Sequence, residues 1–204
     1  FIKDKPYKII GDAAEIDLTG SWKYKVGLDM DDVTPYTERL KNRNNVGSGL
    51  YNGMIYPIRN YQVRGTIWYQ GESNAGNTSR YAELVSSLIT NWRELWNMPE
   101  MPFLLMQLPN FMQKHDKPTD SGWARIREAQ LQAFKTIPNT ALAVTYDVGE
   151  WNDIHPLNKK DMAKRLFLGA RKVVNGEKLV YAGPVYKDMK VESNKIIITF
   201  TEKE

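Results

Sequence analysis

Two polar stretches of this sequence, far apart along the chain, carry residue types that acyl-transfer chemistry uses. The first, residues 70–74, holds a glutamine, a glutamate, a serine and an asparagine. The second surrounds His155, one of two histidines, with Asp153 two residues before it. A neutral imidazole can take a proton from an attacking hydroxyl and return it to a leaving group, while a nearby carboxylate orients it and stabilises its cation. We therefore predict His155 as a general base and Asp153 as its partner.

The first stretch admits two chemical interpretations. In one, the side-chain amides of Gln70 or Asn74, together with main-chain N–H groups, stabilise the oxyanion of acyl transfer. In the other, residues 71–75 form a nucleophile elbow of the Gly-x-Ser-x-Gly kind, with Ala75 in place of the second glycine and Ser73 as the nucleophile. The chain order Ser, Asp, His fits such a hydrolase. A plain helix entry, in which these are only turn residues, is the non-chemical alternative.

Other kinds of function find little support in the composition. His115 lies in a charged run, Lys-His-Asp-Lys, which is typical of a solvated surface loop. Two distant histidines and no cysteine are too few ligands for a zinc site, so neither a metal nor another cofactor is expected. The net charge of +4 is spread along the chain, and no basic patch is interleaved with aromatic residues. No apolar run approaches the ~20 residues that span a bilayer. Nucleic acid and membrane are therefore not expected partners.

Alternating strand and helix patterns must position the two polar stretches. β-branched, aromatic and continuous apolar runs predict three strands, at residues 66–69, 102–108 and 141–148. Apolar residues at three- and four-residue spacing predict three helices, over residues 79–96, 123–134 and 162–173. Ser121 and Asn158 are the expected N-caps of the second and third helix. This order predicts an α/β fold with a mostly parallel sheet and helices on both faces, in which ligands bind at the carboxyl ends of the strands.

The residue composition of the sequence changes near residue 179. Val, Ile and Tyr become frequent, and Gly183-Pro184 and Ser193-Asn194 are expected turns, so this part predicts β-structure. The chain therefore divides into an α/β domain over residues 1–178 and the start of a β-rich segment over residues 179–204. Residues 20–26 alternate like a short strand, whereas residues 29–45 show no clear period, and we assign no chemistry to residues 1–49.

Several motifs together resemble the sialate O-acetylesterases of the SGNH hydrolase superfamily. They follow the family's order over about residues 50–186: Leu50-Tyr51-Asn52-Gly53-Met54-Ile55, Ile67-Trp68-Tyr69-Gln70-Gly71-Glu72-Ser73-Asn74, Trp92-Arg93, Gln107-Leu108-Pro109, Arg127-Glu128-Ala129-Gln130, Asp153-Ile154-His155-Pro156 and Gly183-Pro184. The resemblance implies a flavodoxin-like, three-layer α/β/α sandwich. It also implies a carboxylic ester hydrolase that removes acetyl groups from carbohydrates, sialic acids being the named class. Such a protein is expected to be periplasmic or secreted.

The resemblance also implies roles for single residues of the first stretch. Gln70, Gly71, Glu72 and Asn74 correspond to the block that lines the active site and completes the oxyanion hole. Under this interpretation Ser73 is not the nucleophile.

The second stretch departs from the superfamily pattern in one respect. His155 corresponds to the general base. The superfamily places an aspartate three residues before this histidine, and that position here is Asn152. Either Asp153 or the main chain therefore orients the imidazole.

The nucleophile motif of the family, Gly-Gln-Ser-Asn after the first strand, does not occur in residues 1–49. The chain thus resembles the C-terminal part of an esterase, and we expect the missing N-terminal part of the same protein to supply the serine, the first strand and two oxyanion donors. Two alternatives stay open: a self-contained hydrolase that uses Ser73, and a non-catalytic carbohydrate-binding module. The second would stack sugars on Trp68, Tyr69 and Trp151, although core packing is the simpler role for Trp68.

Overall fold

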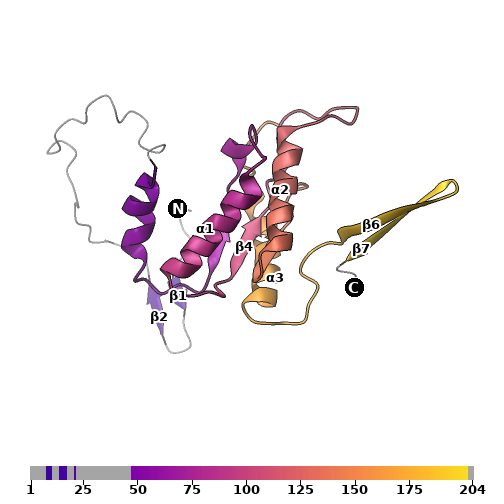
Figure 1. Ribbon diagram of the computed structural model, residues 1–204. Coiled ribbons are helices and arrows are strands. Elements are labelled where there is room, and N and C mark those ends of the chain that lie inside the picture. The colour runs from indigo at the N-terminus through magenta and orange to yellow at the C-terminus, as the bar shows by residue number, and fades with distance from the viewer. Residues whose placement is uncertain (1–7, 11–13, 18–20, 22–46, 202–204) are drawn as a thin grey trace, which may run out of the picture. The chain divides into compact units, whose positions relative to one another are not determined.

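The computed structural model describes residues 8–10, 14–17, 21 and 47–201 (Figure 1). Residues 1–49 and 50–204 form two compact units. In the first unit, β1 (Lys8–Ile10) pairs antiparallel with β2 (Glu15–Asp17). Strands of three residues are too short to give a clear alternation in sequence, which explains why this hairpin was not predicted. Most of residues 1–49, where the nucleophile motif was sought, lie outside the described residues.

A parallel sheet forms the centre of the second unit. Its strands are β3 (Thr66–Trp68), β4 (Phe103–Met106) and β5 (Thr140–Ala143), in the order β3-β4-β5. Ile67, Leu104 and Ala141 share one row of the register. Because both pairs are parallel, the carboxyl ends of all three strands lie at one edge of the sheet.

The third strand is shorter than predicted, since it ends at Ala143 and not near residue 148. The chain turns instead: the Val148 N–H donates to the Thr145 carbonyl at 3.2 Å. Thr145 is fully buried, and its hydroxyl donates to the Gln107 carbonyl. The apolar run therefore continues into a buried turn that the sequence pattern could not separate from a strand.

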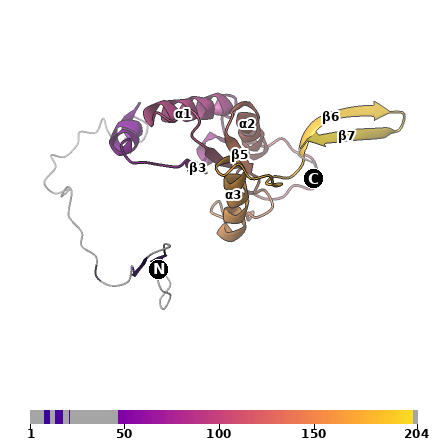
Figure 2. The same cartoon turned by 90° about the horizontal axis from the view of Figure 1, so that it is seen from below.

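The long helices of the described chain, α1 (Tyr81–Leu95), α2 (Gly122–Thr136) and α3 (Lys159–Val173), cover both faces of this sheet. Figure 2 shows α1 and α2 on one face and α3 on the other. Alternate strand residues enter the two cores: Phe103 and Leu105 pack with the first pair of helices, and Leu104 and Met106 pack with α3. The predicted α/β class, with parallel strands between two helical layers, is confirmed.

The predicted N-caps of α2 and α3 are also confirmed. Ser121 Oγ accepts hydrogen bonds from the N–H groups of Trp123 and Ala124, at 3.1 and 3.3 Å. Asn158 Oδ1 accepts one from the Asp161 N–H at 3.2 Å. These side chains satisfy main-chain donors at the first turn of each helix and fix where the helix begins.

Arg93 of α1 holds the amino ends of two strands. Its guanidinium is buried and donates to the Met101 carbonyl, before β4, at 3.0 Å and to the Pro138 carbonyl, before β5, at 2.8 Å. Burial lowers the pKa of Arg93, and the negative charge of Glu100 offsets part of this shift. This clamp lies at the edge of the sheet opposite the polar loops, so Arg93 has a structural role.

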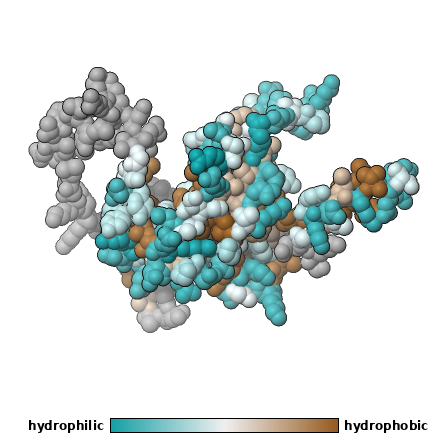
Figure 3. Space-filling model, in the orientation of Figure 1, coloured by the Kyte–Doolittle hydropathy of each residue, from teal (hydrophilic) through white to brown (hydrophobic). Residues whose placement is uncertain are grey.

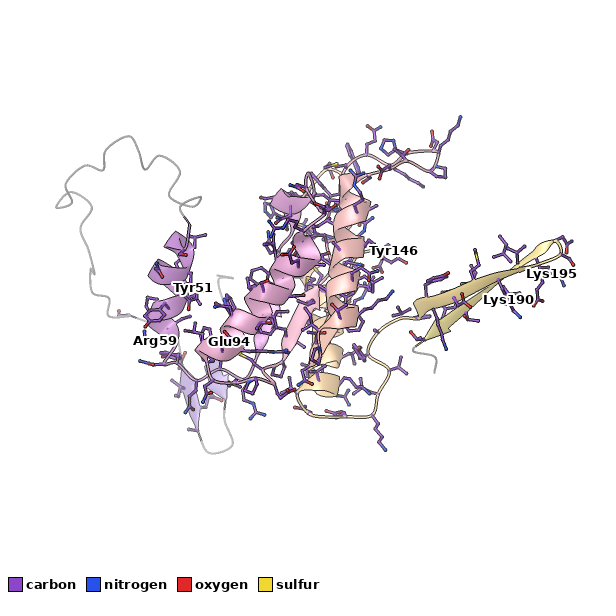
Figure 4. All side chains as sticks on the ribbon, in the orientation of Figure 1. Tyr51, Arg59, Glu94, Tyr146, Lys190 and Lys195 are labelled. Carbon is purple, nitrogen blue, oxygen red and sulfur yellow. The ribbon has the colours of Figure 1, made fainter. Side chains whose placement is uncertain are left out.

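Short helices and a hairpin flank the α/β part. Before β3, a π-helix (Tyr51–Ile55) continues into a 3₁₀-helix (Tyr56–Ile58), and Figure 4 shows Tyr51 and Arg59 in this segment. After α3, β6 (Val185–Glu192) and β7 (Lys195–Thr201) form an antiparallel hairpin that turns at residues 193–194, as predicted. The β-structure begins at Val185 and not at residue 179. No helix within the described residues is long and apolar enough to cross a membrane.

The hairpin has one apolar face. Cross-strand partners point to the same side, so the register gathers exposed apolar residues there: Tyr186, Met189, Val191, Ile196, Ile198 and Phe200. Figure 3 shows hydrophobic side chains beside hydrophilic ones on this hairpin. Lys190 and Lys195, labelled in Figure 4, belong to the opposite, polar face.

Candidate functional site

The loops that follow β3, β4 and β5 meet at the carboxyl edge of the sheet, and a buried glutamine joins the first two. Gln130 of α2 is 4% exposed. Its Nε2 donates to the Gln70 carbonyl at 3.1 Å, and its Oε1 accepts from the Leu108 N–H at 2.9 Å. In the sequence, Gln130 lies at helical spacing from Trp123 and Ile126 and within the motif Arg127-Glu128-Ala129-Gln130, but neither observation gives its side chain a role. A polar residue on the apolar face of a helix was the available signal for this role.

The main chain at Gln70 and Gly71 is tightly enclosed. Tyr81 Oη donates to the Gln70 carbonyl at 2.7 Å, so this oxygen accepts from both Tyr81 and Gln130. Burial raises the pKa of Tyr81, which keeps its hydroxyl protonated as a donor. Gly71 has φ of 151°, and a Cβ there would lie 3.1 Å from Gln130 Nε2. Only glycine suits this conformation in so little space, so the loop geometry depends on it.

The predicted oxyanion residues are brought together in this loop. Gln70 Nε2 donates to Asn74 Oδ1 at 3.0 Å, and among the hydrogen bonds of the described residues its second amide hydrogen has no acceptor. The Gly71 N–H donates to Glu72 Oε2 at 2.9 Å and is therefore engaged within the loop. A 3₁₀-turn (Glu72–Asn74) follows, in which Ser73 is exposed. Among the hydrogen bonds of the described residues, none joins Ser73 to a histidine.

The second predicted group lies in the loop after β5. His155 is exposed, and the next residue, Pro156, is fully buried and anchors the loop. Asp153 Oδ1 accepts the main-chain N–H of His155 at 2.7 Å. The carboxylate that was predicted to partner the imidazole thus fixes the backbone of its residue. Asp153 also forms a β-bridge with Glu150, which folds this loop back on itself.

A contact between Tyr69 and Lys159 links the two groups. Lys159, at the start of α3 just after the His155 loop, holds its Nζ 5.3 Å from the centre of the Tyr69 ring, a cation–π distance. Burial, and then the charge of Glu72, raise the pKa of Tyr69. Tyr69 directly precedes Gln70, so the two predicted groups belong to neighbouring loops of one edge.

The aromatic and histidine candidates differ in exposure: Trp68 is partly buried, and Trp151 and His115 are exposed. Trp68 packs edge-to-face against Trp92 of α1, with ring centres 5.9 Å apart, at the margin of the core. This contact confirms core packing, the simpler role expected for Trp68. Trp151 is 61% exposed and lines a cleft at the same edge as His155. His115 is exposed in the loop before α2, as expected for a surface histidine.

Comparison with known proteins agrees with this architecture. A model of the family described as "Carbohydrate esterase, sialic acid-specific acetylesterase" matches residues 36–166. The chain is 35% identical to the sialate O-acetylesterase of Mus musculus in an alignment of length 172, and the match covers 76% of this chain and 31% of that protein. For the sialate O-acetylesterase of Homo sapiens the identity is 36%, over 76% of this chain and 32% of that protein.

A solved structure of similar fold leads to the same family. The crystal structure of a carbohydrate acetylesterase from Xanthomonas citri aligns with a TM-score of 0.72 and 41% identity, over 79% of this chain and 38% of that one. The chain spans about a third of the length of the curated relatives that it matches. On the strength of the family match and the shared fold, this chain belongs to the sialic acid-specific acetylesterase family of carbohydrate esterases.

Proposed function

We propose that this chain is part of an esterase that hydrolyses acetyl esters on carbohydrates, with sialic acids as the main substrate class and a serine outside residues 1–204 as the nucleophile. The observation that carries the proposal is the position of two groups at one edge of the sheet. His155 is exposed on the loop after β5, and Gln70 has a spare amide hydrogen on the loop after β3. Family membership and the names of the relatives supply the substrate class.

The proposed reaction uses these groups in sequence. The serine oxygen attacks the acetyl carbonyl carbon while its proton passes to the imidazole of His155. The second amide hydrogen of Gln70 donates to the oxyanion that forms. The imidazolium then gives its proton to the sugar oxygen as the C–O bond breaks. Water, deprotonated by His155, finally releases acetate from the acyl-serine by the same steps in reverse order.

The free edge of β3 supports a contribution from another part of the protein. Ile67 is 63% exposed, whereas its neighbours in the same register row, Leu104 and Ala141, are 7% and 2% exposed. β3 is an edge strand of the described sheet, so one side of its main chain has no partner strand there. We propose that a strand from the N-terminal part of the protein pairs with this edge and brings the serine to His155.

Substitution of His155 tests the proposal. In the complete protein, His155→Ala should lower kcat for an O-acetylated N-acetylneuraminic acid by about 10³-fold or more and leave KM nearly unchanged, because a proton-transfer group acts in the transition state. The matched control is His115→Ala, which removes the exposed histidine of the loop before α2. Steady-state kinetics with both variants gives the answer.

Two results would count against this function. Near-normal kcat in His155→Ala contradicts its role as the base. Binding of acetylated sugar with no turnover by the complete wild-type protein favours the non-catalytic carbohydrate-binding alternative.

A further inference from the structure

A cleft of about 700 Å³ opens between the loops after β4 and β5, and the proposed reaction does not use it. It is lined by Asn110, Gln113, Lys114, Gly149, Glu150, Trp151 and Asn152. Its volume is in the range of small-molecule sites, which place a few polar groups around an apolar surface. The cleft shares the loop after β5 with His155, and its lining ends at Asn152, three residues before this histidine.

The two loops are fastened to each other. The Gly149 N–H donates to Asn110 Oδ1 and the Met112 N–H donates to the Trp151 carbonyl, each at 2.8 Å. A Cβ at Gly149 would lie 2.3 Å from the Asn110 carbonyl oxygen, so only glycine allows this approach. These contacts hold the two loops in place before a ligand binds, so binding costs less conformational entropy.

Met112 adds a sign of function in the same place. Its φ is 73°, in the left-handed region that a residue with a Cβ seldom adopts. The hydrogen bond from its N–H to the Trp151 carbonyl holds this conformation. Backbone strain of this kind persists where the surrounding structure imposes it, and it is concentrated at binding and catalytic sites.

Trp151 presents its ring to solvent although its main chain is fixed. Its exposed fraction of 61% is high for the largest apolar side chain, and burial of such a ring is normally favourable. A pyranose ring has an apolar face of C–H groups, which stacks on an indole, and hydroxyl groups at its rim, which hydrogen-bond to amides. Asn110, Gln113 and Asn152 supply amides around Trp151.

The charges of the cleft favour one kind of sugar. Lys114 and Glu150 are the charged residues of its lining, and both are exposed. The Glu150 carboxylate can only accept hydrogen bonds, and the hydroxyl groups of a sugar can donate them. Lys114 is a donor that attracts an anionic group. A sugar acid can satisfy both if its carboxylate lies at Lys114 and its hydroxyl groups lie at Glu150.

We infer that this cleft binds the sugar ring of the substrate, with Trp151 as the stacking surface and Lys114 as the partner of the sugar carboxylate. The inference rests on the proposed function and extends it: the loop after β3 and His155 act on the acetyl group, and the cleft recognises the carbohydrate that carries it. Trp151 and Lys114 are therefore specificity-determining residues.

Calorimetric titration of the complete protein with the methyl glycoside of N-acetylneuraminic acid tests the stacking surface. Trp151→Ala should raise Kd by about 10-fold, which corresponds to ~1.4 kcal/mol, because the stacking surface is lost, and Trp151→Phe should recover most of the loss. The matched control is Phe167→Ala on α3, which removes an aromatic ring of similar exposure, 62%. This glycoside has no acetyl ester, so the measurement does not depend on turnover.

The methyl ester of the same glycoside tests the charge. Lys114→Met should weaken binding of the acid several-fold and leave binding of the neutral ester unchanged. Equal losses for acid and ester, unchanged Kd in Trp151→Ala, or no binding of the glycoside by the wild type would each overturn the inference. Failure of the proposed function has a different result, namely sugar binding with the expected dependence on Trp151 but no release of acetate.

Discussion

At the scale of single residues, hydrogen bonds within the loops decide which groups remain for chemistry. The Gly71 N–H is engaged by Glu72, and one amide hydrogen of Gln70 is engaged by Asn74. The second amide hydrogen of Gln70 is therefore the donor that we assign to the oxyanion. Sequence suggested these residues as candidates, Gln70 and Asn74 through their amides in a polar loop after a strand and Gly71 and Glu72 through the family resemblance. It could not show which of their hydrogens are engaged, since that depends on side-chain rotamers.

Asp153 illustrates the same limit. An aspartate two residues before a histidine suggests a carboxylate–imidazole pair, yet the same spacing lets the carboxylate accept the main-chain N–H two residues ahead. The structure has the second arrangement, with Asp153 Oδ1 2.7 Å from the His155 nitrogen. We therefore describe Asp153 as a positioning residue that acts through the backbone of His155.

This role predicts different results for two substitutions in the complete protein. Asp153→Asn keeps an Oδ1 acceptor and should leave kcat within about 3-fold of the wild type. Asp153→Ala loses the hydrogen bond and should lower kcat by about 10-fold, which corresponds to ~1.4 kcal/mol. Asp116→Asn, in the exposed loop before α2, is the matched control. A loss of about 10⁴-fold in Asp153→Asn, as for a triad aspartate, would show that the charge orients the imidazole.

At the scale of elements, α2 organises the site from beneath. Gln130 joins the loop after β3 to the end of β4, while the N-cap at Ser121 fixes where the helix begins. Periodicity was sufficient to predict α1, α2 and α3, because each helix has one buried face, and β-branched and continuous apolar runs predicted the parallel strands. Such a run gave the wrong end of the third strand, because the buried turn beyond Ala143 is as apolar as a strand. Helix periodicity also did not reveal the bridging role of Gln130, because a position on the apolar face of a helix is interpreted as core whatever side chain it carries.

Gln130→Ala should lower the free energy of unfolding by about 1–3 kcal/mol, since it leaves the buried Leu108 N–H without its acceptor. It should also lower kcat, because the Gln70 carbonyl loses one of its two donors. Urea unfolding and steady-state kinetics measure both effects.

Gln132→Ala is the matched control on the same helix, because the Gln132 side chain is exposed and donates to the exposed Glu128 Oε1. Its free energy of unfolding should stay within about 0.5 kcal/mol of the wild type. Equal stabilities of Gln130→Ala and Gln132→Ala would contradict the bridging role of Gln130.

At the scale of the whole molecule, two surfaces of the second unit are incomplete. One is the edge of β3 with the exposed Ile67, and the other is the apolar face of the β6–β7 hairpin. A two-stranded hairpin is only marginally stable without further partners. The chain spans about a third of the length of its curated relatives, so both surfaces fit a protein in which more chain surrounds this part. Sequence predicted the parallel sheet but could not place the cleft beside Trp151, which forms only where two loops meet.

The central claim is that this chain supplies the base and an oxyanion donor while the nucleophile comes from elsewhere in the protein. The most direct test is to label the complete protein with a fluorophosphonate and locate the adduct by peptide mass spectrometry. We predict a single adduct, on a serine outside residues 1–204, and labelling that is far slower in His155→Ala. An adduct on Ser73 would contradict the account, because it would make the loop after β3 the source of the nucleophile.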